Sequence, residues 1–243
     1  MNENAMVTLF EEWNIIGNGT TGLTSWQGAL FLTDWLLQNM SEKLVGKQVL
    51  ELGCGPGFLG LHLLKNISLN SYTFTDGHPE VLKFAWFNFQ LNCDDLQNQT
   101  DDYETYLYDG LSSVSVDFPK IGQCRKSGCT VAVEKVDWTD EHLKTYENID
   151  LILAADTVYE RTLIPPFVSV LKSLLKIDEN RYALVSCTER SVTTLNTFES
   201  CLAKEELEFS VLVRGAFAPG ESLLCSDVLH QMTRVYEIKN LLK

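Results

Sequence analysis

Hydrophobic and polar positions along this chain follow two periods. Short apolar runs that end in a turn or a polar residue predict buried strands. These runs cover residues 48–52, 71–75, 131–136, 151–155, 182–187, 208–213 and 234–240. Apolar residues that recur every three or four positions predict helices over residues 28–38, 58–66, 79–92, 163–176 and 191–204.

The order of these elements predicts the fold class. Strands that alternate with helices form a parallel sheet with helices on both faces. The last two runs have no helical pattern between them, so one strand at the edge should be antiparallel. We therefore expect an α/β, Rossmann-like, doubly wound sheet of seven strands, mostly parallel with one antiparallel edge strand. Residues 1–45 precede the first strand and add an N-terminal helical segment.

Nothing in the sequence divides the chain into two domains. Its 243 residues contain no internal repeat and no linker, so we expect one domain over residues 1–243. Residues from about 97 to 129 are polar and interrupt the alternation of strands and helices. This stretch is longer than an ordinary connection and predicts an insertion.

Charge and hydropathy exclude several classes of partner. The 33 acidic and 19 basic residues give a net charge of -14. That potential repels phosphate backbones, so we expect no direct nucleic-acid contact, and it favours encounter with a basic partner. No apolar run approaches the length of a membrane span, and the first ten residues do not resemble a signal peptide. We expect a cytoplasmic protein with no membrane contact.

The cysteines do not predict disulfides or a metal centre. There are seven, an odd number without paired spacing, and several lie inside apolar runs, where a reduced thiol behaves as a small hydrophobe. Cys124 and Cys129 could form half of a zinc site, but no second pair or nearby histidine completes four ligands. We expect no metal.

The glycine-rich stretch ELGCGPG, residues 51–57, is the most informative in the chain. A ligand can lie against the backbone there, near the positive end of the helix that follows, beyond the carboxyl end of the first strand. Asp76 ends the second strand, where a carboxylate can accept both hydroxyls of a ribose. Residues 55–60 also satisfy the G-x-G-x-x-G pattern of dinucleotide-binding proteins. A nicotinamide cofactor and a turn without any ligand therefore remain alternatives at this point.

Three features favour a cofactor that carries an amino acid and an adenine. Glu51 lies directly before the glycines, where its carboxylate can indirectly hold an ammonium group. Asp137 and Trp138 follow the third strand and offer an acceptor for an adenine amino group and a ring to stack on it. Asp156 and Tyr159 follow the fourth strand, beside the place where a transferred group would project. Singly, these residues could be core rings or a helix cap; their placement at successive strand ends favours a binding site.

Together these motifs resemble those of the seven-strand S-adenosylmethionine-dependent methyltransferases. Within them, the chain is similar to the protein-lysine methyltransferases marked by an E-x-G-x-G-x-G turn and a D-x-x-Y sequence after the fourth strand. Both are intact here, at residues 51–57 and 156–159. The segment GTTGLTSW over residues 19–26, followed by Ala29-Leu30 and Trp35, resembles the members that modify elongation factor 2. The similarity runs from about residue 19 to the C-terminus, apart from the insertion.

The resemblance implies a role for each matching position. Trp26 would contact the cofactor from the N-terminal side, with residues 1–45 lying over the cofactor cleft. The backbone at Ala155 would contact the cofactor near its reacting end, and Asp156 and Tyr159 would face the lysine. The residues expected to bind the cofactor, from the motifs and the resemblance together, are Trp26, Glu51, Gly53, Cys54, Gly55, Asp76, Asp137, Trp138 and Ala155.

The resemblance also implies the reaction. We expect a monomeric enzyme that transfers a methyl group from S-adenosylmethionine to a lysine of a protein, with elongation factor 2 as the implied substrate. Asp156 is expected to align the lysine and not to act as a base, because a carboxylate raises the pKa of a nearby amine. Tyr159 could offer its ring face or its hydroxyl. The alternatives are a methyltransferase for another protein, a small molecule or RNA, and a catalytically silent binding module with the same fold.

Overall fold

Eight strands form one sheet in the computed structural model, which describes residues 6–12, 20–93, 109–124, 127–140, 143–216 and 231–241. The strands are β1 Gln48–Leu52, β2 Ser71–Asp76, β3 Lys120–Gln123, β4 Thr130–Lys135, β5 Leu151–Ala155, β6 Tyr182–Thr188, β7 Leu207–Gly215 and β8 Thr233–Asn240. The helices include α1 Gln27–Asn39, α2 Ser41–Leu44, α3 Phe58–Asn66, α4 Pro79–Cys93, α6 Ile164–Leu175 and α7 Val192–Lys204. All five predicted helices are present within one or two residues of their expected ends.

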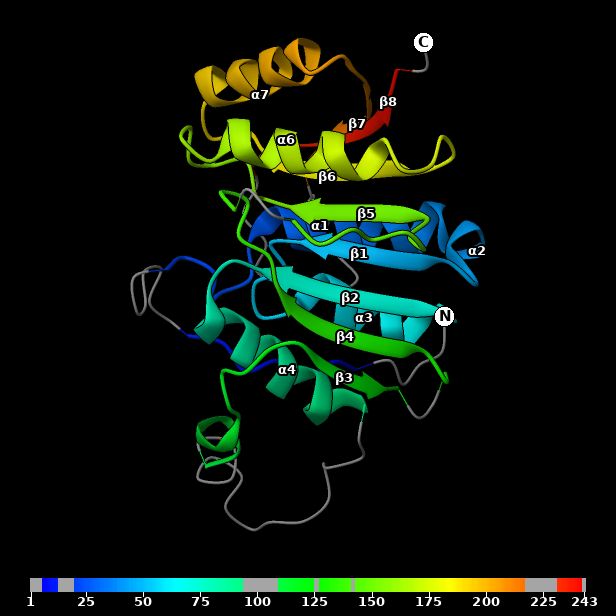
Figure 1. Cartoon of the computed structure of the whole chain (residues 1–243), viewed down its shortest axis with the longest axis vertical. Helices are drawn as coiled ribbons and strands as arrows, with labels where there is room; N and C mark the ends of the chain where they lie inside the picture. The colour runs from blue at the N-terminus through cyan, green and yellow to red at the C-terminus, as the bar shows by residue number, and fades with distance from the viewer. Residues whose placement is uncertain are drawn as a thin grey trace.

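The sheet has the doubly wound order β3-β4-β2-β1-β5-β6-β8-β7. Its five central strands are parallel, and their carboxyl ends lie together at the left of Figure 1. The chain runs outward from β1 through β2 to β4 on one side and through β5 to β6 on the other. Strand order therefore reverses between β1 and β5, which is where open α/β sheets bind their ligands.

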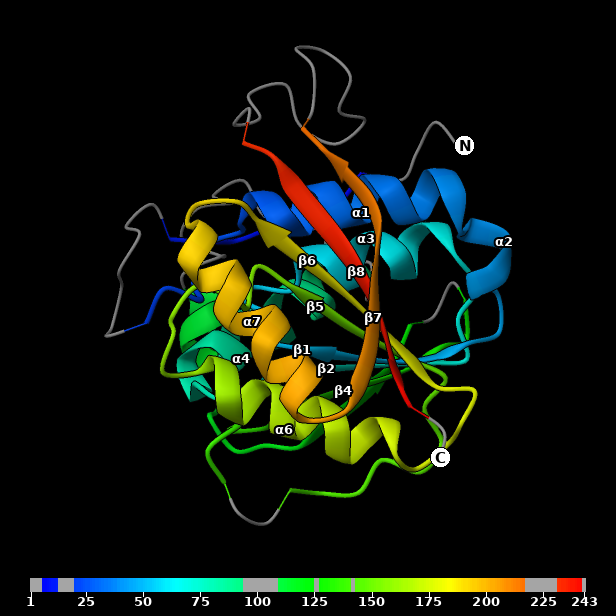
Figure 2. The same ribbon diagram turned by 90° about the horizontal axis from the view of Figure 1, so that it is seen from above.

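Alternate residues of the parallel strands supply two cores, one on each face of the sheet. Val49 packs in the core beneath α1, α3 and α4, whereas the next residue, Leu50, packs in the core beneath α6 and α7. Figure 2 shows α1 and α3 on one side of the strands and α6 and α7 on the other. Because both faces are covered, the central strand β5, Leu151–Ala155, is apolar along its whole length.

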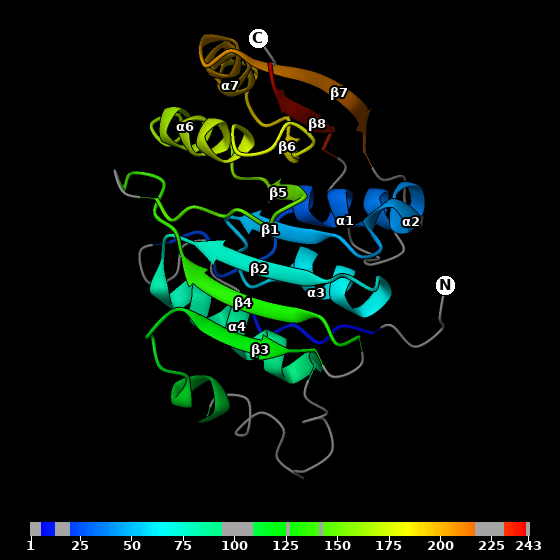
Figure 3. The same ribbon diagram turned by 45° about the vertical axis from the view of Figure 1, so that its right-hand side comes forward.

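The predicted α/β, Rossmann-like architecture is confirmed, with two differences in the sheet. An eighth strand, β3, lies inside the predicted insertion and pairs antiparallel with β4. The second difference concerns the reversed strand, β8, which is not at the edge but between β6 and β7. Figure 3 shows β3 and β7 at the two opposite edges. In this inner position β8 buries Val235, Tyr236 and Ile238 fully, whereas at the edge β7 buries only Leu207.

The first described residues attach to the sheet through α4. Asn88 and Asn92 of that helix exchange side-chain hydrogen bonds with the backbone of Phe10 and Thr8. Asn88 also donates to the carbonyl oxygen of Pro56 in the glycine turn at 2.8 Å. Phe10 and Pro56 of the glycine turn are thereby joined through the same asparagine side chain.

Two findings on membrane spans and metal sites concern the described residues only. No helix in these ranges has the length and apolar character that a membrane crossing requires. They also contain no cluster of three His, Cys, Asp or Glu side chains that could hold a metal ion. Cys225 lies outside the described residues, and the single-domain organisation of residues 1–243 stays a prediction.

Candidate functional site

A cavity of about 250 Å³ opens beyond the carboxyl ends of the parallel strands. Residues 20–26 form one wall, and the glycine turn and the residues after β2, β4 and β5 form the others. A smaller hollow of about 30 Å³ continues it toward Glu51 and Cys54. Both are lined by Trp26, Gly53 and Ala155, so they form one continuous site.

The structure brings together every residue that the sequence predicts for the site. The residues that line the larger cavity, the smaller hollow or both are Trp26, Glu51, Gly53, Cys54, Gly55, Asp76, Asp137, Trp138, Ala155, Asp156 and Tyr159. They come from five separate stretches of the chain. Strand ends gather them because parallel strands deliver their carboxyl ends to one edge of the sheet.

The glycine turn leaves room for a ligand against its backbone. Gly53 and Gly55 have φ angles of +68° and +56°, which a residue with a Cβ rarely adopts. A Cβ on Gly53 would also lie 2.8 Å from Thr157 Cγ2 and 3.3 Å from Trp138 Cζ2. Glycine is therefore required at this position by conformation and by space.

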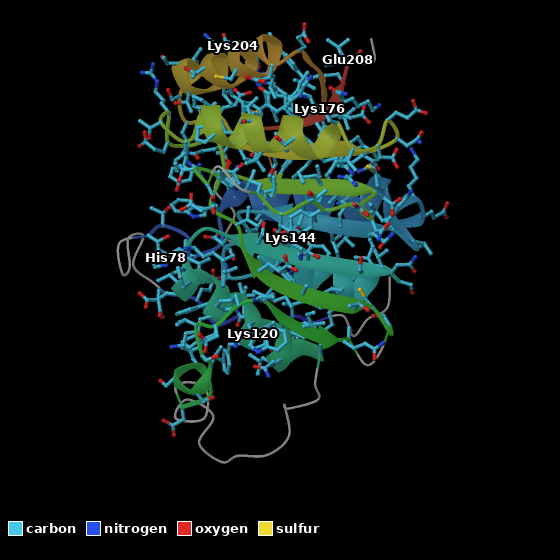
Figure 4. The ribbon with its side chains drawn as sticks, in the orientation of Figure 1. His78, Lys120, Lys144, Lys176, Lys204 and Glu208 are labelled. Atoms are coloured by element: carbon cyan, nitrogen blue, oxygen red, sulfur yellow. The ribbon has the colours of Figure 1, made fainter. Side chains whose placement is uncertain are left out.

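Asp76 presents an ordered carboxyl group to the cavity. The backbone N–H of His78 donates to it at 3.0 Å, and that of Gly55 at 3.4 Å. Burial raises the pKa of Asp76 to about 6, although these backbone N–H groups act in the opposite direction. At neutral pH the carboxyl group is ionised and can accept hydrogen bonds from ribose hydroxyls. Figure 4 shows His78 at the same end of the sheet, where β2 ends.

Glu51 lies deeper, at the end of the smaller hollow. Only 2% of its surface is exposed, and its carboxyl accepts a hydrogen bond of 2.7 Å from the Tyr72 hydroxyl. Burial raises the pKa of Glu51 to about 8, and the nearby Asp76 acts in the same direction. The group is thus mostly neutral at pH 7 until a cation approaches. Burial also raises the pKa of the Cys54 thiol, so Cys54 is not a nucleophile.

Unsatisfied polar atoms in the wall fit a polar ligand. His78 Nδ1, Trp138 Nε1 and Thr157 Oγ1 are buried without a hydrogen-bond partner, and all three residues line the larger cavity. Leaving such atoms unpaired costs about 1–3 kcal/mol each. The Trp138 ring is held from behind by Phe167, at 4.9 Å between centroids. A ligand with an aromatic base and several polar groups therefore suits this cavity.

Asp137 lies at the rim beside Trp138. Its Oδ1 accepts hydrogen bonds from Thr139, at 2.9 Å from the backbone nitrogen and 2.7 Å from the hydroxyl. These bonds hold the pKa of Asp137 below its usual value. An ionised acceptor thus stands next to the ring that is expected to stack on adenine.

The carboxylate of Asp156 is almost fully enclosed, and its side chain is 2% exposed. Its Oδ2 accepts from the backbone N–H of Gly28, the hydroxyl of Thr188 and the guanidinium of Arg190, each at 2.9 Å. Its Oδ1 accepts from the backbone N–H of Thr188 at 2.7 Å. Tyr159 differs, since 51% of it is exposed at the cavity. The two D-x-x-Y side chains therefore have opposite surroundings.

Sequence reasoning missed Thr188 and Arg190. Both follow the apolar stretch of β6, whose carboxyl end lies beside that of β5. The pattern that indicated Asp156, polar side chains directly after a buried apolar run, also holds here. The polar residues Thr188, Glu189 and Arg190 follow the apolar part of β6.

Comparison with known proteins decides the family. The sequence model described as "Lysine methyltransferase" matches residues 2–111 and 121–204. The chain belongs to the lysine methyltransferase family. This confirms the predicted resemblance and, at the level of the family, the predicted S-adenosylmethionine cofactor.

Several curated proteins are similar in sequence to this chain. Protein-lysine N-methyltransferase EEF2KMT of Homo sapiens is 31% identical over 211 residues, which are 84% of this chain and 55% of that protein. Protein-lysine N-methyltransferase EFM3 of Saccharomyces cerevisiae is 25% identical over 224 residues, 86% of this chain and 57% of that protein. The chain spans a little over half the length of these relatives.

Solved structures share the fold at low sequence identity. The methyltransferase domain of bacterial CtHen1 has a TM-score of 0.53 and 16% identity, covering 88% of this chain and 98% of that one. Magnesium protoporphyrin IX methyltransferase from Synechocystis, crystallised with bound SAH, has a TM-score of 0.52 and 15% identity, covering 88% and 83%. These similarities support the Rossmann-like fold of the lysine methyltransferase family member.

Proposed function

We propose that this protein transfers a methyl group from S-adenosylmethionine to a lysine side chain of elongation factor 2. The observation that carries the proposal is the single cavity where the glycine turn, Asp76, Trp138 and the D-x-x-Y residues meet. Family membership supports lysine as the acceptor. The segment before α1 and the relatives named EEF2KMT and EFM3 support elongation factor 2.

The residues of the cavity match the parts of the cofactor. Trp138 and Asp137 would hold the adenine, and Asp76 the ribose hydroxyls. Beyond these, the smaller hollow would take the methionine end. The residues proposed to line that end are Gly53, Cys54, Gly55 and Glu51, with Trp26 and Ala155 nearest the reacting atom. The ammonium of the methionine end would restore the negative charge of Glu51.

The bound cofactor supplies a sulfonium methyl group, which the neutral lysine nitrogen takes as the carbon–sulfur bond breaks. The protein aligns the amine and places charges around it. Tyr159, half exposed at the mouth, can direct its ring face to the nitrogen as that atom becomes cationic, a contact worth about 0.5–2 kcal/mol. Asp156 already accepts four hydrogen bonds, so it is not a base; it would align the amine through the groups that it holds in place.

Labelling tests the substrate. The protein is first incubated with radiolabelled S-adenosylmethionine and a cell extract. In a second reaction, purified elongation factor 2 replaces the extract. We expect one labelled protein of the size of elongation factor 2, with the label on lysine. Label on RNA or on a small molecule would overturn the assignment. Cofactor binding without any labelled product would show a silent binding module.

Trp138→Ala is expected to weaken cofactor affinity about 5- to 100-fold. Stacking of a base on an aromatic ring contributes about 1–3 kcal/mol, and the substitution removes it. Isothermal titration calorimetry with S-adenosylmethionine measures the change. The matched control is Trp86→Ala, whose ring packs against Phe89 of α4 and does not line the cavity. Equal affinities in the wild type and Trp138→Ala would remove the adenine assignment.

A further inference from the structure

Arg190 lies between two residues of the cofactor cavity. Its guanidinium donates to Oδ2 of Asp156 at 2.9 Å, and its Cζ lies 5.1 Å from the centre of the Trp26 ring. The side chain is 34% exposed, so the group is neither buried nor free in solvent. A permanent positive charge is therefore fixed at the rim, where residues 20–26 meet the end of β5.

The other donors to Asp156 cannot easily be exchanged. Two are backbone N–H groups, of Gly28 and Thr188, and the third is the buried Thr188 hydroxyl. With Arg190, four donors share the two oxygens, which leaves little acceptor capacity for a lysine ammonium. The negative charge of Asp156 is already compensated before any substrate arrives.

A small second cavity connects Arg190 with Tyr159. It has a volume of about 60 Å³ and is lined by Tyr159, Thr188, Arg190 and the first turn of α7. Tyr159 lines the larger cavity as well. Tyr159 is therefore the residue that lines both the larger cavity and the small cavity beside Arg190.

Of the acidic groups near Arg190, Asp156 is its ion-pair partner, and Glu11 accepts a hydrogen bond from the backbone N–H of Ser25. Glu189, its neighbour in sequence, pairs with Arg214 of β7 at 2.6 Å and with Arg234 of β8 at 2.5 Å. Cys187 of β6 stays a neutral thiol, because burial raises its pKa. From the loop after β5, the Glu160 carboxyl faces the backbone N–H and hydroxyl of Thr162. The other residues around the guanidinium, namely Trp26, Ser191, Thr194 and Leu195, are uncharged.

We propose that Arg190 is a positioning residue that keeps the incoming lysine amine in its neutral, reactive form. This inference rests on the proposed function. A free lysine has a pKa of about 10.4 and arrives protonated, and a lone carboxylate would hold it so. A guanidinium that neutralises the carboxylate and faces the amine has the opposite effect. The proton leaves to water, and the freed lone pair then forms the nitrogen–carbon bond as the carbon–sulfur pair goes to sulfur.

The pH dependence of kcat tests this inference, because kcat reports groups in the enzyme–substrate complex. The full chain carrying Arg190→Gln is assayed from pH 6 to 10 with purified elongation factor 2 and saturating S-adenosylmethionine. We expect the acid limb to move up by about 1 pH unit, so that kcat falls about tenfold at pH 7 and recovers on the plateau. Cofactor affinity, measured by calorimetry, should stay within about threefold.

Two variants serve as comparisons. Arg190→Lys keeps the positive charge and is expected to return the acid limb toward that of the wild type. Arg214→Gln breaks another arginine–carboxylate pair, with Glu189, whose arginine lines neither cavity, and should leave the profile unchanged.

Each remaining outcome overturns the inference. An equal loss of kcat at every pH, or a loss of cofactor affinity as large as the loss of kcat, would give Arg190 a structural role only. A profile identical to that of the wild type would show that the charge does not act on the amine. A wild-type protein that methylates no protein at any pH would overturn the proposed function and this inference with it.

Discussion

Asp156→Ala is expected to lower the free energy of unfolding by about 3–5 kcal/mol and to reduce methyl transfer at least about 100-fold. Removing an enclosed carboxylate leaves its hydrogen-bond donors without an acceptor, which costs about 1–3 kcal/mol for each buried donor. The substitution leaves donors from three places without an acceptor: Gly28 of α1, Thr188 at the end of β6, and Arg190 beyond it. Asp156 also has a φ of +52°, a conformation that alanine adopts less readily than aspartate.

Urea unfolding and a methyl-transfer assay measure the two effects of Asp156→Ala separately. Asp156→Asn is the sharper variant, because asparagine tolerates the backbone angle and its oxygen can keep the three donors to Oδ2. Its amide nitrogen would then face the N–H of Thr188, so about 1–3 kcal/mol of stability should be lost. If Asp156→Asn loses cofactor affinity as strongly as transfer, Asp156 only supports the fold.

Glu51→Gln is expected to stabilise the ligand-free protein by about 3 kcal/mol at pH 7 while weakening cofactor binding about 10- to 100-fold. The folded-state pKa of Glu51, about 8, lies above the ordinary value of 4.5. Stabilisation from this group is complete below pH 4.5 and is lost as the pH rises through about 8. Glutamine does not titrate, so the variant avoids this loss. It also lacks the charge that would bind the ammonium of the cofactor.

Unfolding curves at pH 5, 6, 7 and 8 test the stability part of the Glu51 prediction. The wild type should lose stability over this range relative to Glu51→Gln, and Glu42→Gln, an exposed change on α2, should follow the wild type. Calorimetry at pH 7 in two buffers of different ionisation enthalpy tests the binding part. The wild type should release close to one proton on binding the cofactor, and Glu51→Gln none. Parallel pH curves for the wild type and Glu51→Gln would contradict the buried, neutral carboxyl.

The sequence predicted which residues gather at the site because that depends on strand ends. Asp76, Trp138 and Asp156 each follow a buried apolar run, and parallel strands bring such positions to one edge of the sheet. Strand β3 escaped prediction because its sequence, Lys-Ile-Gly-Gln, has neither the length nor the apolar pattern of the others. The order of β7 and β8 could not be predicted either, because the hydrophobic pattern does not indicate which of the two strands pairs with β6.

The surroundings of each site residue could not be predicted in the same way. Gly28 lies 128 positions from Asp156 in the sequence, and nothing local to either residue indicates their hydrogen bond. Tyr72 reads as an ordinary strand aromatic, yet its hydroxyl is the partner of Glu51. Local pattern determines which residues reach the edge of the sheet, whereas the pairing of their polar atoms depends on how distant elements pack.

Helix α1 makes hydrogen bonds to residues that lie 128 to 206 positions later in the sequence. Gly28 binds Asp156 and accepts a hydrogen bond from Ser186, and Gln27 donates to the carbonyl oxygen of Gln231 and to Thr233. Its apolar residues Phe31, Leu32 and Leu36 belong to the core in which α1 packs against α3, β6 and β8. The contacts with β6 and β8 join parts of the chain that are far apart in the sequence, and contacts of this kind slow folding.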